Sequence, residues 1–328
     1  EQFYQKVVKY LIFGNVLKNN TYPLSVSAER IIQAIEIVEY AKSVNAKYIA
    51  HGSTGAGNDQ VRFDMIFQIL APEIEIITPI RDNALSREEE ISYLNSKGID
   101  LSWDKAKYSI NKGLWGTSVG GDETLTSNLA LPEEAYPSAV KNNNETLVKL
   151  SFIKGELVAI DGIENTPIEN IQKLNELAST YAIGRDIHVG DTIVGIKGRV
   201  GFEAAAALII IKAHHLLEKH TLSKWQLQHK DYFANWYGTH LHEGLYLDPV
   251  MRDLEAFLES SQKSVSGDVT VTLKPYHFTL DGIKSDYDLM KADFGSYGEE
   301  NKGWTADEAK GFIKIYGNQT KIYQNVNK

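Results

Sequence analysis

Apolar side chains in the first hundred residues follow two kinds of spacing. Helical spacing predicts helices over residues 1–20, 27–43 and 59–70. Short apolar runs predict strands at residues 46–51 and 73–80. Ser86 and Glu89 have the spacing of a capping box, which predicts a further helix that Gly98 ends. Strands that alternate with helices in this way predict a doubly wound α/β domain with a parallel sheet.

The pattern changes near residue 100. Residues 101–145 are rich in glycine and proline and predict irregular structure. Beyond them, alternating apolar and polar positions predict hairpins, over residues 145–160 and 268–280, and a strand at residues 193–196. Thr166 and Glu169 predict a second capping box, and helices are expected over residues 167–181, 203–219 and 249–260. This half therefore predicts a larger α+β domain.

The bulk composition narrows the class of protein. A length of 328 residues fits two domains, and a net charge of −9 argues against a nucleic-acid partner, which needs a basic face. The longest strictly apolar run, residues 204–211, is too short to span a bilayer, so no membrane partner is expected. The chain has no cysteine, which excludes disulfides and thiolate chemistry and fits a cytoplasmic protein.

Residues 51–64, HGSTGAGNDQVRFD, carry the strongest chemical signal. They follow an expected strand and open an expected helix, and Gly52, Gly55 and Gly57 let backbone N–H groups approach a ligand. The positive end of the helix favours an anion there. Asp59 and Arg62, about one turn apart, offer an acceptor for an ammonium and a fork for a carboxylate. A site for phosphate, amine and carboxylate together indicates chemistry that joins a nucleotide to an amino acid.

Spacing alone leaves a simpler alternative for this loop, a tight turn closed by an asparagine cap. The loop has neither the G-x-x-x-x-G-K-[ST] pattern nor the G-x-G-x-x-G pattern of common phosphate-binding loops. The whole string, however, resembles the H-G-x-T-G-K-G-N-D-Q-V-R-F-E segment of argininosuccinate synthase. Similar blocks recur along essentially the whole chain, at residues 22–30, 108–118, 194–199 and 311–313.

The resemblance implies an ATP-dependent ligase of arginine biosynthesis. In that family the ureido oxygen of citrulline attacks the α-phosphate of ATP, pyrophosphate leaves, and the amine of aspartate then displaces AMP. ATP is thus the implied cofactor, with Mg²⁺ accompanying it, and aspartate and citrulline are the implied partners. The implied assembly is a homotetramer. Catalysis of this kind depends mainly on positioning and charge stabilisation.

The resemblance also assigns roles to individual residues. Three residues are implied at the reacting centre: Arg62, Asp59 and Asn58. The aspartate-binding residues are Thr54, Asn58 and Asp59. The citrulline-binding residues are Tyr22, Ser27, Asn58, Arg62, Ser109, Ser118 and Phe202. The ATP-binding residues are His51, Gly52, Ser53, Thr54, Gly55 and Gly57. Taken singly, Ser109 and Ser118 could be turn hydroxyls and Tyr22 a half-buried core residue.

The family's nucleotide loop, S-G-G-x-D-T-S, is not found in this sequence. Since Glu1 aligns after that loop and the chain opens inside an expected helix, we expect the missing part upstream. The expected organisation is a nucleotide-binding domain lacking its N-terminal part (residues 1–100), a synthetase domain for substrate binding and oligomerisation (residues 101–305) and a C-terminal tail (residues 306–328). The alternatives are a non-catalytic amino-acid-binding or scaffolding relative and another adenylating enzyme; the acidic balance argues against a tRNA-modifying one.

Two departures from the family pattern concern the amino-acid substrate. Gly190 stands where the family has a glutamate that holds citrulline, and Phe202 stands where it has a tyrosine. Losing a carboxylate leaves the α-ammonium of citrulline poorly compensated and opens space, which suggests an N-acylated citrulline as substrate. In the alternative, Asp186 or Asp191 replaces the glutamate. Ala56 also replaces a family lysine near the phosphates, a role that Lys197 or Arg199 could take unless they are surface charges.

Histidines do not predict a metal site. The spacing of His240, His242 and Glu243 fits no zinc signature, so we expect solvent-facing or capping side chains. His214 and His215 are expected on a helix that could face a subunit partner. The apolar residues near the C-terminus, including Phe312, Ile313, Ile315 and Tyr316, fit either a subunit contact or a buried edge strand.

Overall fold

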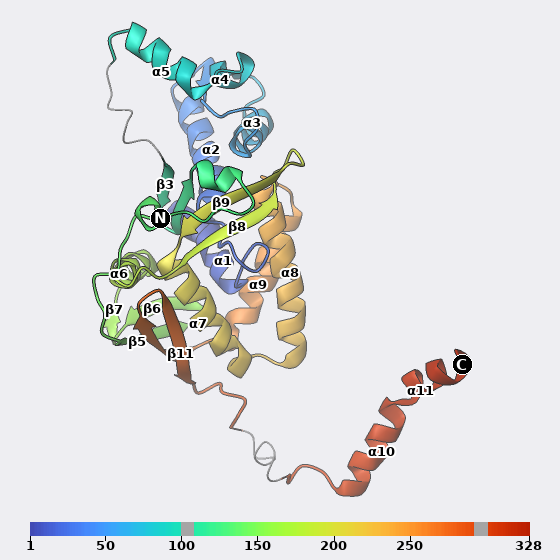
Figure 1. Ribbon diagram of the computed structural model, residues 1–328. Coiled ribbons are helices and arrows are strands. Elements are labelled where there is room, and N and C mark those ends of the chain that lie inside the picture. The colour runs from blue at the N-terminus through green and yellow to red at the C-terminus, as the bar shows by residue number, and fades with distance from the viewer. Residues whose placement is uncertain (100–107, 292–300) are drawn as a thin grey trace. The chain divides into compact units, whose positions relative to one another are not determined.

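A computed structural model describes residues 1–99, 108–291 and 301–328. The chain divides into two units, Glu1–Tyr287 and Asp288–Lys328 (Figure 1). The α/β class expected from the sequence is confirmed, since strands β1 (Tyr48–Ala50) and β2 (Glu75–Ile77) pair in parallel. In the described residues no helix is long and apolar enough to cross a membrane.

The helices of the first hundred residues lie close to their predicted positions. They are η1 (Tyr4–Val8), α1 (Lys9–Phe13), α2 (Ser25–Ser43), α3 (Asp59–Leu70), α4 (Pro79–Asp82) and α5 (Arg87–Ser96). The predicted capping box of Ser86 and Glu89 is confirmed. The predicted first helix is too long, because it ends at Phe13. Asn15, Asn19 and Asn20 then adopt positive φ angles of 50°, 52° and 59°, which a right-handed helix does not allow.

The larger unit also contains two antiparallel sheets. One has the strand order β11-β10-β5-β6-β7 and the other β3-β4-β9-β8. The first contains β5 (Thr146–Ile153), β6 (Glu156–Ile160), β7 (Ile163–Glu164), β10 (Gly267–Lys274) and β11 (His277–Lys284), which confirms both predicted hairpins. The second contains β3 (Ser109–Gly113), β4 (Gly116–Gly120), β8 (Arg185–Asp191) and β9 (Lys197–Glu203).

The second sheet corrects two predictions. Residues 109–120 form a hairpin within the segment expected to be irregular; the remainder of that segment contains the short turns η3 (Asp122–Leu125) and η4 (Glu133–Ala135). Strand β4 is buried from Gly116 to Val119, so both of its faces carry small or apolar residues and no alternation marks it. The strand predicted at residues 193–196 is instead the turn between β8 and β9, where Gly195 has a φ of 87°.

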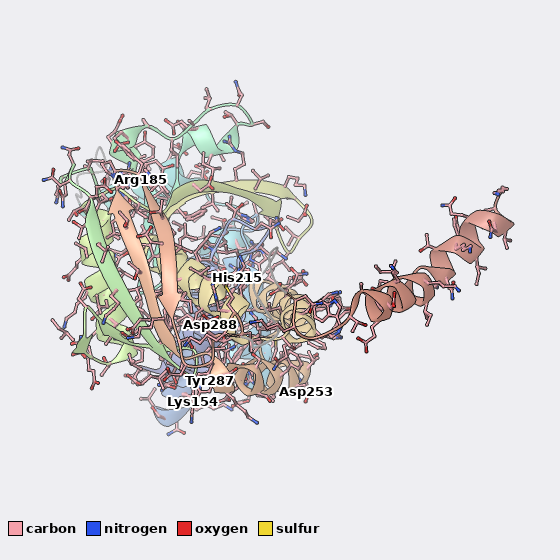
Figure 2. All side chains as sticks on the ribbon, turned by 90° about the horizontal axis from the view of Figure 1, so that it is seen from below. Lys154, Arg185, His215, Asp253, Tyr287 and Asp288 are labelled. Carbon is pink, nitrogen blue, oxygen red and sulfur yellow. The ribbon has the colours of Figure 1, made fainter. Side chains whose placement is uncertain are left out.

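Arg185 connects the two sheets at the start of β8. Its guanidinium donates to Glu203 Oε2 at 2.9 Å and to Glu133 Oε1 at 2.6 Å. The same group lies over the ring of Tyr276 in the β10–β11 turn, with its carbon 6.0 Å from the ring centroid. Arg185 is labelled in Figure 2. The contact with Tyr276 links the start of β8 to the β10–β11 turn of the five-stranded sheet.

Four helices complete the larger unit. They are α6 (Pro167–Ser179), α7 (Ala205–Thr221), α8 (Lys224–His242) and α9 (Val250–Ser261), followed by the short turn η5 (Gln262–Ser264). The capping box of Thr166 and Glu169 is confirmed at α6. Helix α8 was not predicted. Its sequence is largely polar, yet Lys230, Ala234 and Tyr237 are buried in one stripe of its surface.

A charged network lies inside this helical layer. Lys230 and Glu218 are both fully buried, with Lys230 Nζ 2.9 Å from Glu218 Oε2. Asn15 and Gln262 also donate to the Glu218 carboxylate. Burial opposes ionisation of Glu218, but His214, Lys230 and the hydrogen bonds hold its pKa below the usual value. This glutamate therefore carries a compensated charge in the core.

His214 belongs to the same network, which corrects the expectation that it faces a partner. It is fully buried and bonds to Asn15 Oδ1 at 2.6 Å and Gln262 Oε1 at 2.9 Å. Burial is the main reason that its pKa falls to about 4. His242 is also buried rather than solvent-facing, with 8% of its surface exposed.

The smaller unit contains the helices α10 (Ala306–Tyr316) and α11 (Asn318–Val326). The alternative prediction of a buried edge strand at these positions is wrong. Thr305 and Glu308 form a capping box that starts α10 and so selects helix. Both helices expose apolar side chains, namely Phe312, Ile313, Ile315, Tyr316, Ile322, Tyr323 and Val326.

Candidate functional site

A cavity of about 600 Å³ lies where the glycine-rich loop, α2, α3, β4 and the β8–β9 hairpin meet. Eleven of the fourteen residues to which the resemblance assigns a role line it: Tyr22, Ser27, His51, Gly52, Ser53, Thr54, Gly57, Asn58, Asp59, Arg62 and Ser118. Residues as far apart in the sequence as Tyr22 and Ser118 thus converge on one space. Its size suits one or two small ligands.

His51 anchors the glycine-rich loop through hydrogen bonds of both its ring nitrogens. The backbone N–H of Ser53 donates to His51 Nδ1 at 3.2 Å, so Nε2 carries the hydrogen that it shares with Asp64 Oδ1 at 2.6 Å. Arg81 Nη1 donates to the other Asp64 oxygen at 2.6 Å. The chain from Ser53 through His51 and Asp64 to Arg81 joins the loop to α3 and α4.

Asp59 and Arg62 form the charged centre of the cavity together with a residue to which the sequence assigned no role, Arg30. Asp59 accepts from Arg62 Nη1 at 3.0 Å with one oxygen and from Arg30 Nε at 3.1 Å with the other. Two guanidinium groups thus flank one carboxylate. The cluster carries an excess positive charge, which favours an anionic ligand beside it.

Arg62 is held more tightly than its sequence motif suggests. It is only 3% exposed, and its Nε and Nη2 donate to the carbonyl oxygen of His242 at 3.0 and 2.8 Å. Burial lowers its pKa, while Asp59 opposes that shift. Most of its N–H groups therefore serve protein partners. What it offers a substrate is mainly positive charge and a fixed position for Asp59.

Asn58 links the loop to the opposite wall. Its Oδ1 accepts from the backbone N–H of Ile193 in the β8–β9 turn at 2.8 Å. Asn58 thereby brings that hairpin against the start of α3. Asn58 stands at the predicted N-cap position of α3, but its side chain makes no capping hydrogen bond to the helix.

Tyr22 and Ser27 shape the end of the cavity predicted to bind citrulline. The Tyr22 hydroxyl accepts from the backbone N–H of Val26 at 3.2 Å, and its ring packs on Phe202 and on His188. Ser27 is 6% exposed, and its buried Oγ has no hydrogen-bond partner among the described residues. An unpartnered hydroxyl beside a cavity is costly unless a ligand satisfies it.

Three predicted site residues do not line the cavity: Gly55, Ser109 and Phe202. Phe202 is fully buried, with its ring centroid 5.4 Å from that of Tyr22. Its contribution to the cavity is therefore indirect, through support of the tyrosine. Ser109 lies on the edge strand β3, paired with Gly120.

The charged residues of the β8–β9 hairpin are already paired. Lys197 is largely exposed and lies 2.6 Å from Asp191, which lowers the pKa of that carboxyl group. Arg199 donates to backbone carbonyl groups of residues 123, 126 and 129, although it also lines the cavity. Asp186 Oδ1 accepts from the N–H of Ile187 at 2.7 Å and is not a cavity residue.

The cavity also contains residues that the sequence did not single out as ligands, notably Arg30, Asn111, His188 and His242. Arg30 lies three positions after Ser27 on α2, so helical spacing could have identified it. Asn111 accepts from Arg30 Nη2 at 3.0 Å. The two residues are 81 positions apart, so no local sequence pattern predicts this contact. His242 contacts Arg62 through its backbone carbonyl group, so the identity of its side chain gives no sign of this role.

The parallel β1–β2 pair with its glycine-rich loop, joined to antiparallel sheets that complete one charged cavity, defines a two-part α/β enzyme-like protein. Comparison with known sequences gives its family. Residues 1–100 match the Arginosuccinate synthase N-terminal HUP domain, and residues 108–323 match the Arginosuccinate synthase C-terminal domain. The chain therefore belongs to the argininosuccinate synthase family.

Individual relatives agree over nearly the whole chain. It is 37% identical to argininosuccinate synthase of Methanocaldococcus jannaschii over 326 residues, which cover 98% of this chain and 82% of that protein. It is also 37% identical to the enzymes of Pyrococcus furiosus, with 99% and 80% covered, and of Staphylococcus aureus strain bovine RF122, with 100% and 82% covered.

Proposed function

We propose that this protein is an ATP-dependent ligase of arginine biosynthesis that joins aspartate to a citrulline-type acceptor and releases AMP and pyrophosphate. The observation that carries the proposal is the convergence of the glycine-rich loop, the Arg30–Asp59–Arg62 cluster and the Tyr22–Ser27–Ser118 wall on one cavity. Family membership supports the same reaction. In this proposal residues 1–100 serve nucleotide binding, residues 101–305 form the synthetase domain and residues 306–328 are a tail.

The proposed division of labour follows the chemistry of each wall. The loop from His51 to Gly57 lies against the nucleotide phosphates, at the positive end of α3. Thr54, Asn58 and Asp59 hold aspartate, whose ammonium takes the remaining acceptor capacity of the Asp59 carboxylate. The excess positive charge of Arg30 and Arg62 attracts its carboxylates and stabilises charge that develops during displacement of AMP.

The acceptor is held at the other end of the cavity, between Tyr22, Ser27 and Ser118. Its ureido oxygen must reach the α-phosphate, and its product must then meet the amine of aspartate. Both steps gain from reacting groups confined in one small space. Mg²⁺ enters with ATP in this proposal and neutralises phosphate charge. Among the residues that the structure describes, no group of three acidic, histidine or cysteine side chains could hold a metal ion by itself.

We further propose that the acceptor is an N-acylated citrulline. Two carboxylates line the cavity, and both already pair with cations, Asp59 with two arginines and Asp191 with Lys197. Asp186 is occupied by a backbone N–H. Of the two aspartates that could replace the family's glutamate, Asp186 lies outside the cavity and Asp191 is paired with Lys197, which favours an acceptor without an α-ammonium. An amide in place of that ammonium removes the need for compensation.

Pyrophosphate release from full-length protein tests the ligase. With ATP, Mg²⁺, aspartate and either N-acetylcitrulline or citrulline, we expect pyrophosphate and AMP in equal amounts and a product that contains both amino acids. Binding of aspartate without pyrophosphate release would instead support a non-catalytic relative.

We also propose a homotetramer, supported by the exposed apolar side chains of α10 and α11. Light scattering of the same preparation should give the mass of four chains.

A further inference from the structure

His188 is a buried histidine at the cavity with an unsatisfied ring nitrogen. It lies on β8, lines the cavity and is 6% exposed. Its ring stacks on Tyr22, with the centroids 5.2 Å apart. Its Nδ1 is enclosed and has no hydrogen-bond partner among the described residues. A polar ring in this position is costly for the fold, and because Nδ1 is enclosed, only Nε2 can meet a ligand.

The other ring nitrogen faces the space beside Gly190. A Cβ atom on Gly190 would lie 2.5 Å from His188 Nε2, which is closer than any real contact of this kind. The two positions are therefore coupled, since the imidazole fills the space that a side chain at residue 190 would need. Because Gly190 also lines the cavity, Nε2 lies at its wall.

The state of the ring follows from its surroundings. Burial, and then the positive charge of Lys18, lower the pKa of His188, so the ring is neutral near pH 7. A hydrogen on Nδ1 would be an enclosed donor without an acceptor, which is the less favourable arrangement. The hydrogen is therefore assigned to Nε2, which makes this atom a donor beside Gly190.

The charges around His188 disfavour an ammonium. Lys18 adds positive charge from the loop after α1, and Arg62, on α3, also lines the cavity. His242 is neutral, because burial, Arg62 and Lys18 lower its pKa to about 3. The nearest cavity carboxylate on the same hairpin, Asp191, pairs with Lys197. A neutral or anionic group at this end of the cavity is thus favoured over a cationic one.

We propose that His188 is a specificity-determining residue, whose Nε2–H donates a hydrogen bond to the carbonyl oxygen of an N-acyl group on the acceptor, while Gly190, which has no side chain, leaves room for the imidazole. The inference rests on the proposed function, since it assigns the residue that reads the acceptor. It goes further by stating which contact separates acylated from free citrulline. It also explains why a buried polar ring and a glycine occur together.

Two substitutions of His188 separate recognition from structural support. His188→Leu removes the donor, while His188→Gln keeps an amide N–H close to the position of Nε2. For each variant, kcat/KM and the calorimetric Kd are measured with N-acetylcitrulline, N-succinylcitrulline and citrulline. His229→Leu, on the exposed face of α8, is the control.

We expect His188→Leu to lower the ratio of kcat/KM for the acylated to the free substrate by roughly 3- to 10-fold, mainly through KM, which is the effect of one hydrogen bond. His188→Gln should recover most of the ratio, and His229→Leu should leave it unchanged. A preference for the succinyl over the acetyl form would indicate that Lys18 also contributes. In His188→Ala/Gly190→Glu the ratio should reverse, because the ring no longer blocks the carboxylate.

The outcomes distinguish this inference from the ligase proposal. If the native protein releases pyrophosphate but prefers free citrulline, or if His188→Leu keeps the native ratio, the role of His188 is wrong while the ligase stands. If no pyrophosphate is released with any acceptor, but N-acetylcitrulline binds more tightly than citrulline and His188→Leu removes that preference, the ligase is wrong while His188 recognition stands. Equal binding of the acylated and free forms overturns the inference.

Discussion

Replacement of Arg62 by leucine is expected to lower kcat/KM for aspartate by roughly 10²- to 10³-fold. Arg62 is buried and hydrogen-bonded, while its partner Asp59 is partly exposed. Loss of one partner from a hydrogen-bonded charge pair at a binding site costs about 2–5 kcal/mol, and each 1.4 kcal/mol corresponds to about a factor of ten in rate. Arg62→Leu has three separate effects on the site. Asp59 is freed from one of its guanidinium partners, the carbonyl group of His242 loses its donors, and the cavity loses a positive charge.

Matched variants identify which of these effects matters. Arg62→Lys keeps the charge but not the planar fork and should recover only part of the activity. Asp59→Asn keeps the shape of the carboxylate without its charge and should impair aspartate more than the acceptor. Arg252→Leu breaks another Arg-to-acid pair three residues apart, with Glu255 on α9, and should leave activity unchanged. Pyrophosphate release that is unaffected in Arg62→Leu would contradict the assigned site.

Replacement of Lys230 by methionine is expected to destabilise the protein by about 3–5 kcal/mol. The side chain is fully buried, and its removal leaves the carboxylate of Glu218 in the core without its closest cation. Lys230 Nζ also donates to the carbonyl oxygen of Phe13 at 3.1 Å, so the end of α1 loses a contact as well. Thermal unfolding should show a Tm lower by roughly 10 °C.

The double variant Lys230→Met/Glu218→Gln tests the cause of that loss. Glutamine keeps the size of Glu218 without its charge, although its single oxygen can accept from only one of Asn15 and Gln262, so the double variant should still be more stable than Lys230→Met alone. Lys212→Met, at an exposed position of α7, controls for the loss of a lysine and should unfold as the native protein does. An unchanged Tm in Lys230→Met would show that the pair contributes no stability.

Local patterns in the sequence predicted much of this fold because the signals are local. Capping boxes at Ser86 and Thr166 fixed the starts of two helices, and strict alternation identified both outer hairpins. Strand β4 and helix α8 carry no such signal. The strand is buried on both faces by small residues, and the helix buries a lysine whose partner lies on another helix.

The cavity shows the same division. The loop from His51 to Arg62 was found because all of its residues lie within twelve positions. Arg30, Asn111 and His242 join it only through contacts over 29, 81 and 180 positions. Such contacts depend on how the sheets and helices pack, and no spacing rule along the chain expresses them. His188 is a further case, since its role in the cavity depends on its contacts with Gly190 and with the ring of Tyr22.

The central claim is that aspartate and a citrulline-type acceptor meet in this one cavity. An experimental structure of the full-length protein with aspartate and N-acetylcitrulline tests it most directly. The account predicts aspartate against Thr54, Asn58 and Asp59, and the acceptor between Tyr22 and Ser118 with its acyl oxygen at His188. Aspartate bound elsewhere, or an acceptor whose α-nitrogen lies on a carboxylate rather than beside His188 and Gly190, would contradict it.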